Sequence, residues 1–450
     1  MGSISQAWAV GSSGFENASL SARSIGQSNA VVARPTNPDT VVFNPAGIPE
    51  LEGVQITGGV AGVNTHTWFK SSTSTGGSEK NTPQLALVPN FYMTVNPGDK
   101  LPGEALDNRL GFGVGVNSPF GLKNRYDSTG VMGRYTGFRN YLEMIAVTMA
   151  GGVKLTDNVS VGGGAVNYVA YKYQQIANFP NSNILAAVVP GNTFADGQAR
   201  SELSGNGWGW TFGALVKPAE KHRVGFYYRS RATVGVEGTF KIENLNPLLA
   251  SPLLGNIFPT SPSFETTVKS DVNLPSSMTL GYAYVPSEKW AIEVDVAFTR
   301  WSVFADQDAE FGFSNVVTRG LGVTPRDYND TWSFYIGGHY QLTDKIDLLA
   351  GALYYEAASP KGHVDNVLVD ADRLAASIGI RYKVTENLDV DMAYLGMYHF
   401  KRDIANGQVF AKTGLNIDGK YQSYTNDFMM NITYRFDAIP FIKDNSTVKS

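Results

Sequence analysis

The side chains that most often perform catalysis are present in this sequence, but their spacing indicates no active site. A Gly-x-Ser-x-Gly nucleophile motif is absent, and Gly111–Gly115 precedes no helical pattern, which a dinucleotide site requires. We therefore expect neither an enzyme nor a metal or cofactor site. A barrel lipid hydrolase, whose serine and histidine meet only in space, stays as an alternative. No metal-binding spacing such as His-x-x-x-His joins the five histidines, which are His66, His222, His339, His363 and His399.

Two arginines could recognise a carboxylate. Arg229 and Arg231 share one face of a strand and Tyr228 lies on the other, because side chains alternate along a strand. If the apolar face points outward, both guanidinium groups point inward, where they could hold a carboxylate head group. The alternative is that they balance inward-facing acids such as Glu293 and Asp295.

The composition excludes several classes of protein. The 450 residues carry a formal net charge of -4 and no cysteine, and this near-neutral balance argues against nucleic acid as a partner. No apolar run reaches the roughly 18 to 20 residues of a membrane-spanning helix. Residues Met1–Ser5 have neither the basic start nor the apolar core of a signal peptide. We therefore expect that an export signal, if the protein has one, has been removed.

Strict alternation of apolar and polar residues predicts long β-strands in the second half of the chain. From Trp290 to Phe298 the even positions are apolar, and the odd positions are alanine or acidic. The same pattern covers 332–340, 388–400 and 428–436. A soluble sandwich also alternates. Aromatic residues at the ends of the apolar face, opposite a face rich in small residues, favour a membrane barrel with a crowded lumen.

The turns indicate how many strands the barrel has. Leu155–Val159, Leu342–Ile346 and Val384–Leu388 repeat one short hairpin pattern. With three similar turns near 96–99, 217–221 and 286–289 they make six. Short turns that alternate with long loops are typical of outer-membrane barrels, so we expect an all-β antiparallel barrel of about fourteen strands. Seven long connections separate these turns, at 64–84, 120–140, 175–205, 236–270, 305–326, 358–370 and 404–419.

The ends of the chain do not follow the strand pattern. Residues 1–50 are rich in Ser, Ala, Asn and Gly and do not alternate, and a wide barrel has a lumen to fill. We expect 1–50 to be a plug inside a barrel formed by 51–436, with a polar tail at 437–450. A disordered periplasmic arm is the alternative for the first segment.

Several short motifs, in their order along the chain, resemble one known family. Asn44-Pro45-Ala46-Gly47 looks like the plug-to-barrel signature of the FadL/TodX-type outer-membrane transporters, and 113–122 resembles the third strand of that family. Asn273-Leu274-Pro275 and Asp372-Arg373 are similar to residues of its members. The resemblance covers about 8–436. It implies a fourteen-strand barrel with an N-terminal plug, transporting long-chain fatty acids or aromatic hydrocarbons across the bacterial outer membrane.

The resemblance also implies a route through the barrel. Ligand is captured between the third and fourth long loops, passes to an inner pocket and leaves sideways where the third strand kinks. Pro119 follows a glycine-rich strand and cannot donate to a ladder, so pairing must break there. The alternative is simply the end of that strand. The expected kink comprises Ser118, Pro119, Phe120 and Gly121.

The third and fourth long loops are unusually apolar, and exposed apolar patches usually mark binding surfaces. We expect them to form the capture groove, although the two loops could instead pack on each other. The groove residues are Ile184, Leu185, Val188, Val189, Leu245, Leu248, Leu249, Leu253, Leu254, Ile257 and Phe258.

The inner pocket is harder to assign. Glu356 lies near the place where the resemblance implies an acidic pocket residue, in the sequence Glu-Ala-Ala-Ser-Pro. Arg229 and Arg231 are the candidates for a head-group contact. Phe15 and Ile25 of the plug could contact ligand or only pack.

The predicted function is passive uptake of a hydrophobic small molecule, a fatty acid or a hydrocarbon. The expected partners are this ligand and outer-membrane lipid or lipopolysaccharide, and a monomer is expected because a closed barrel leaves no free edge. The rivals are a polar-solute porin, a barrel hydrolase and a soluble adhesin.

Overall fold

The computed structural model describes residues 14–73, 77–98, 109–186, 189–322, 324–364, 369–405 and 417–436. Within them, strands dominate, and each predicted run of alternating residues is extended. The strands are β1 (Val54–Ser71), β2 (Ser78–Lys80), β3 (Leu85–Val95), β4 (Leu110–Asn117), β5 (Gly121–Arg125), β6 (Arg139–Thr156), β7 (Val159–Phe179), β8 (Gly197–Ala219), β9 (His222–Arg229), β10 (Ala232–Glu243), β11 (Phe264–Leu274), β12 (Ser277–Ser287), β13 (Trp290–Thr299), β14 (Ala309–Phe311), β15 (Thr331–Thr343), β16 (Ile346–Tyr355), β17 (Arg373–Lys383), β18 (Leu388–His399), β19 (Arg402–Ile404) and β20 (Gly419–Phe436).

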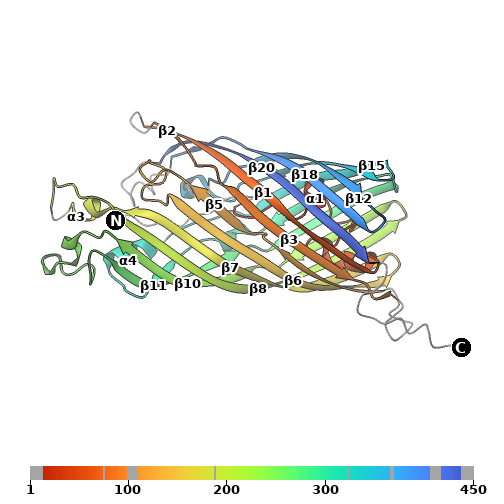
Figure 1. The fold of residues 1–450 in the computed structure, drawn as a ribbon, viewed down its shortest axis with the longest axis horizontal. Helices are drawn as coiled ribbons and strands as arrows, with labels where there is room; N and C mark the ends of the chain where they lie inside the picture. Colours follow the sequence, from red (N-terminus) through yellow and green to blue (C-terminus); the bar gives the residue numbers. More distant parts are fainter. Residues whose placement is uncertain are drawn as a thin grey trace.

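These strands form one closed antiparallel barrel. The first and last strands pair along their whole length, from Val54 opposite Phe436 to Ser71 opposite Gly419. Three strands are short pieces in loops (β2, β14 and β19), and three pairs (β4/β5, β9/β10 and β11/β12) are single strands with a break. Counted this way, the described residues form fourteen strands, as the turns predicted. They run at an angle to the long axis (Figure 1), as closure of a barrel requires.

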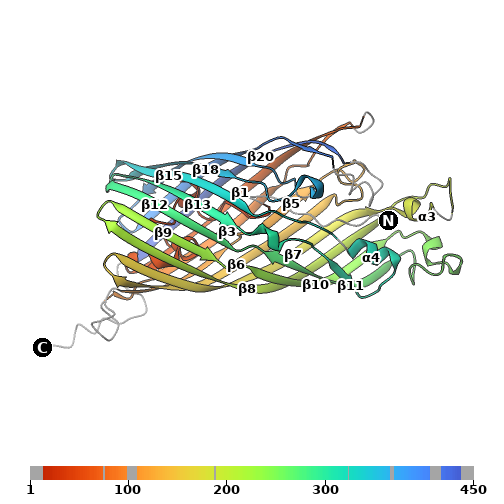
Figure 2. The ribbon, with the colours of Figure 1, turned by 180° about the vertical axis from the view of Figure 1, so that it is seen from behind.

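The side chains alternate across the wall as expected. In β13, Ala291, Glu293 and Asp295 are buried on the inside, whereas Trp290 and Ile292 are exposed on the outside. Two-residue turns join β6 to β7 and β15 to β16, since Thr156 pairs with Val159 and Thr343 with Ile346. Figure 2 shows the opposite side of the barrel, where β8, β9, β12, β13 and β15 lie.

The long connections are shorter than the sequence predicted. The range 236–270 was expected to be loop, yet β10 continues to Glu243 and β11 begins at Phe264. Likewise β8 begins at Gly197, inside the expected loop 175–205. The strands therefore extend well beyond the part of the wall that carries exposed aromatic residues such as Trp208 and Trp210.

Helices are few and short in the described residues. None of them is long and apolar enough to cross a membrane. They are α1 (Ala22–Ile25), α2 (Thr40–Phe43), α3 (Asn181–Leu185) and α4 (Val316–Gly322), with 3-10 turns η1 (Pro45–Glu50), η4 (Pro247–Ala250), η5 (Pro252–Leu254), η6 (Trp301–Val303) and η7 (Lys361–His363).

The described residues before β1, 14–53, contact the inner faces of several strands. We call them the inner segment. The Ala22 amide donates to Asn431 Oδ1 of β20 at 2.7 Å, and the Ala33 amide donates to Glu293 Oε1 of β13 at 2.6 Å. Gly337 of β15 must be glycine, since a Cβ there would lie 2.0 Å from the Gln27 carbonyl oxygen. The small inward residues noted in the sequence therefore make room for this segment. The division into plug 1–50, barrel 51–436 and tail 437–450 stays a prediction, because 1–13 and 437–450 lie outside the described residues.

The Asn-Pro-Ala signature joins this inner segment to the wall. Asn44 accepts from the Ala46 amide at 3.2 Å and so caps η1, and Pro45 occupies its first position, where no amide is needed. The Asn44 amide group donates to the carbonyls of Val32 (2.8 Å) and Ala214 (3.2 Å). One side chain thus ends the inner segment, tightens its turn and fastens it to β8.

Candidate functional site

The third strand of the barrel is interrupted at the predicted kink. β4 ends at Asn117, β5 begins at Gly121, and Pro119 between them has no amide to donate. On the β6 side, pairing stops at Asn117 opposite Ala146 and resumes at Gly121 opposite Glu143. The strand therefore stays attached to β6 while it bends.

On the β3 side the ladder of the closed wall is interrupted. β3 pairs with β4 only from Phe91 to Val95, and its upper part, 85–90, has no partner strand on that side among the described residues. Above the gap, the Thr82 amide donates to the Arg125 carbonyl at 2.8 Å and joins the two edges again. We call this opening, bounded by β3 and β5, the wall window.

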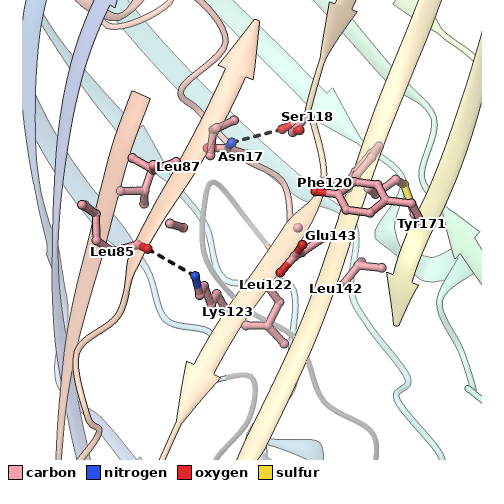
Figure 3. Close-up of a pocket in the computed structure, with 15 residues that line it drawn as sticks. Asn17, Leu85, Leu87, Ser118, Phe120, Leu122, Lys123, Leu142, Glu143 and Tyr171 are labelled. Carbon is pink, nitrogen blue, oxygen red and sulfur yellow. Dashed lines mark hydrogen bonds between the residues drawn. The ribbon is translucent and has the colours of Figure 1, made fainter. Parts of the chain in front are cut away.

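A cavity of about 270 Å³ lies in the wall window. The side chains around it are mostly aliphatic or aromatic (Figure 3). At its rim, Lys123 Nζ reaches across the gap to the Leu85 carbonyl (3.3 Å), and Lys172 pairs with Glu143 (3.2 Å). The cavity is lined in part by Asn17, Leu85, Leu87, Phe120, Leu122, Leu142, Met144 and Tyr171.

The inner segment holds the broken strand from inside. The amide of Asn17 donates to the Pro119 carbonyl (2.7 Å) and its side chain to the Ser118 carbonyl (3.0 Å). The Gly121 amide donates to the Phe15 carbonyl (3.1 Å). Phe15–Asn17 thus acts as a short substitute strand that satisfies the backbone groups exposed by the kink.

Phe15 is fully buried against the inner side of the kink. Its ring centroid lies 5.6 Å from that of Phe120, 5.0 Å from Trp301 and 5.4 Å from Phe304. These rings belong to the largest hydrophobic cluster of the described residues. Ile25, the other apolar candidate of this segment, is buried in a separate cluster with residues of β17, β18 and β20.

Arg229 points inward, as predicted, and reaches the inner segment. Its Nη2 lies 2.6 Å from Glu16 Oε1, and its guanidinium lies 4.9 Å from the Phe120 ring centroid. A second cavity, of about 90 Å³, lies beside this pair in the lumen. Its lining includes Glu16, Asn17, Arg229 and three tyrosines, Tyr227, Tyr335 and Tyr355. We call it the inner cavity.

The structure places the other two pocket candidates elsewhere. Arg231 is exposed rather than inward, because the break between β9 and β10 at Ser230 shifts the alternation, so that Ala232 becomes the next buried residue. Glu356 is half-buried and accepts from the Trp332 amide at 2.8 Å. Neither residue lines the inner cavity.

The predicted groove residues mostly pack together. Leu185, Leu245, Leu249 and Phe258 are buried in the same large cluster, and Ile184, Leu248, Leu254 and Ile257 pack against it. Val189 is half-buried, and Val188 lies outside the described residues. Leu253 stands apart, with 86% of its surface exposed. The two loops therefore do pack on each other, and their apolar surface open to solvent centres on Leu253.

Glu16 and Asn17 were not among the predicted residues. One signal was available, because Glu16 is the only acidic residue before Asp39, and a lone acid in a segment bound for a barrel lumen calls for a cation. The partner could not be named from local pattern, since it lies on a strand more than 200 residues away in the sequence. Among the residues that the structure describes, no group of His, Asp and Glu could hold a metal ion.

Comparison with known proteins agrees with this architecture. A family model described as outer membrane protein transport protein (OMPP1/FadL/TodX) matches residues 3–436. Outer membrane protein P1 of Haemophilus influenzae is 25% identical over 95% of this chain and 94% of its own length. A long-chain fatty acid transport protein of Escherichia coli is 24% identical over 94% of both.

Solved structures share the fold. A FadL homologue from Pseudomonas aeruginosa superposes with a TM-score of 0.77 at 19% identity, covering 94% of this chain and all of the other. The toluene transporter TodX of P. putida superposes with a TM-score of 0.69 at 16% identity, covering 93% and 99%. The family match spans nearly the whole chain, and so this protein belongs to the OMPP1/FadL/TodX family of outer membrane transport proteins.

Proposed function

We propose that this barrel takes up hydrophobic small molecules, long-chain fatty acids foremost, by a passive lateral route. Its family consists of outer-membrane transporters of hydrophobic substrates. In the proposed route, the third and fourth long loops capture the ligand. A rearrangement of the inner segment then opens the path, and the ligand leaves sideways through the wall window into the membrane.

The wall window is the observation that carries this proposal. An apolar cavity in a barrel wall, between two strands that should be paired, offers an aliphatic chain a path that avoids water. A water-filled pore would need no such gap. The inner side of the window is occupied by Phe15 and Asn17, so passage requires these residues to move.

A fatty acid and a hydrocarbon are the two candidate ligands. One similar protein is a long-chain fatty acid transport protein, and one structural neighbour is a toluene transporter. The inward Arg229 favours a ligand with a carboxylate, because a guanidinium binds it through two parallel hydrogen bonds. An aromatic hydrocarbon has no group to use that charge. We also expect the barrel to be a monomer in contact with outer-membrane lipid or lipopolysaccharide through its exposed aromatic residues.

A displacement titration tests the function. Purified barrel in detergent would be loaded with a fluorescent fatty acid and competed with oleate or toluene. We expect oleate to displace the probe. We expect Arg229→Ala to weaken oleate by roughly tenfold or more, since a hydrogen bond to a charged group contributes about 1.5 to 3 kcal/mol. Arg231→Ala is the matched control, because Arg231 is exposed.

The outcomes separate the candidates. Displacement by toluene alone would reassign the protein to hydrocarbon uptake. Failure of both competitors to bind would favour a polar-solute porin, whose conductance would also survive deletion of residues 245–258. Turnover of a lipid ester would instead indicate the hydrolase.

Leu253 tests the capture step. We expect Leu253→Asp to weaken oleate binding by about tenfold, because it replaces an exposed apolar contact worth roughly 1.5 kcal/mol with a charge that repels the carboxylate. Val316→Asp is the matched control, since Val316 is also exposed but belongs to α4, outside the two loops. Equal weakening by both changes would argue against a groove at Leu253.

A further inference from the structure

The short segment Phe15–Asn17 separates the two cavities of the barrel. Asn17 lines both the wall window and the inner cavity, Glu16 lines the inner cavity, and Phe120 lines the wall window. Three hydrogen bonds hold this segment to the kinked strand. If the segment leaves, the two cavities become one continuous path.

We call Phe15–Asn17 the partition. Its Glu16 forms an ion pair with Arg229, which connects the partition to the barrel wall. The two side chains are largely buried, with 19% and 12% of their surfaces exposed, and their charges meet at 2.6 Å. Arg229 also lies over the Phe120 ring at 4.9 Å. One arginine therefore contacts both the partition and the kink, from a strand that does not pair with the kinked strand.

The groups around the inner cavity suit an anionic head group. Besides Arg229, its lining includes hydroxyl-bearing side chains, Tyr227, Tyr335, Ser277 and Thr279, which can donate hydrogen bonds to a carboxylate. The volume of about 90 Å³ accommodates a few water-sized groups. A head group fits, whereas a long aliphatic chain must extend elsewhere.

We propose that Glu16 occupies the position of the ligand's head group, so that Phe15–Asn17 is a gate that opens selectively for carboxylates. The inference rests on the lateral route proposed above. A carboxylate that enters the inner cavity takes Arg229 from Glu16. With its ion pair gone, Phe15–Asn17 keeps its hydrogen bonds to the kink and the ring contacts of Phe15, but it loses its charged contact with the β9 wall and can leave the window.

The exchange explains why charge matters. A buried arginine without a counter-charge is costly, but the exchange of one carboxylate for another never leaves Arg229 unpaired. An uncharged ligand cannot compete for the guanidinium, so it has no differential affinity for the open state from this contact. The gate thus distinguishes fatty acids from their neutral analogues.

The test compares oleate with methyl oleate, which has the same chain and no charge. Displacement titrations would use wild-type barrel, Glu16→Gln and Glu50→Gln. Glu50 is the matched control, because it also ties the inner segment to the wall, through Lys217, away from both cavities. We expect Glu16→Gln to tighten oleate binding about tenfold, since the internal competitor is lost, and to leave methyl oleate unchanged. Glu50→Gln should change neither.

Hydrogen exchange gives a second measurement that does not depend on affinity. In wild-type barrel, oleate should speed amide exchange at 15–21, and methyl oleate should not. In Glu16→Gln the exchange should be fast without ligand. Equal effects of Glu16→Gln on both ligands, or none on either, would overturn this inference and leave uptake standing. A wild-type barrel that binds neither ligand would overturn the proposed function itself.

Discussion

A disulfide between the inner segment and the kinked strand is expected to stop uptake until it is reduced. Glu16 and Phe120 are partners in an isolated antiparallel bridge, flanked by the Asn17–Pro119 and Gly121–Phe15 hydrogen bonds. Partners in such a non-hydrogen-bonded position have Cα atoms about 4.5 Å apart, which is within the range of a disulfide. The sequence has no cysteine, so Glu16→Cys/Phe120→Cys can form only one bond.

The locked barrel should transport poorly for a simple reason. No differential affinity of a ligand can move a segment that a covalent bond holds in place, so oleate uptake by cells should fall by about tenfold or more. Addition of dithiothreitol should restore it to the level of the two single variants, Glu16→Cys and Phe120→Cys. Uptake that is equal in the oxidised and reduced forms would mean that ligand does not pass this segment.

A second disulfide serves as the control for stiffening of the barrel itself. Thr65 and Thr425 face each other between β1 and β20, with their hydroxyl oxygens 2.9 Å apart. Thr65→Cys/Thr425→Cys would join two wall strands without touching the inner segment. We expect its uptake to be the same before and after reduction.

The wall was predictable from sequence because its rule is local. Alternation in β13 and β18 assigned inside and outside correctly, since a two-sided strand imposes a period of two on its own residues. Polar turns at Asp157-Asn158 and Asp344-Lys345 gave the ends of the strands. Counting these turns gave the fourteen strands, because each hairpin turn implies two neighbours.

The prediction ended several strands too early because the apolar residues of a strand face outward in one part and inward in another. Low in β8, Trp208 and Trp210 face outward and are exposed. Higher in the same strand, Ala199 and Leu203 are the buried, inward residues. Outside the membrane the wall faces water, so the apolar residues turn to the inside. A pattern that reverses its sense resembles irregular loop when it is compared with the membrane part.

The site was less predictable because its contacts are distant in sequence. Pro119 indicated the kink, since its missing amide has a local consequence. The residues that fill the resulting gap, Phe15 and Asn17, come from a segment without periodicity. The break between β9 and β10, at Ser230 and Arg231, shifted the alternation and sent Arg231 to the opposite side from the prediction. The alternation of residues predicts neither the contact of the inner segment with the kink nor the break between β9 and β10.

Loss of Arg23 is expected to loosen the inner segment while the wall stays intact. The Arg23 guanidinium donates to Asp391 at 3.1 Å and to the Thr36 carbonyl at 3.0 Å, and it pairs with Asp389 at 3.4 Å. Both aspartates are fully buried on β18. Arg23→Ala leaves the Asp391 carboxylate without its cation, and breaking a buried pair from one side costs about 3 to 5 kcal/mol.

That cost falls on the inner segment rather than on the barrel. Asp389 keeps Arg381 and Arg435 as partners, and the strand ladders do not involve Arg23. We therefore expect Arg23→Ala to retain the β-sheet signal and the mobility of a folded barrel on unheated gels. Its ion conductance in planar lipid bilayers should rise well above that of wild type, because the inner segment is no longer held against β18.

The double variant Arg23→Ala/Asp391→Asn decides whether charge is the cause. Removing the carboxylate as well relieves the penalty of an unpaired buried charge, so the double variant should conduct less than Arg23→Ala alone. If the single and double variants conduct equally, the packing of the arginine chain, rather than its charge, holds the segment. If conductance stays at the wild-type level in both, the lumen is closed by contacts other than Arg23, and the polar groups at Ala22, Ala33 and Asn44 become the next positions to change.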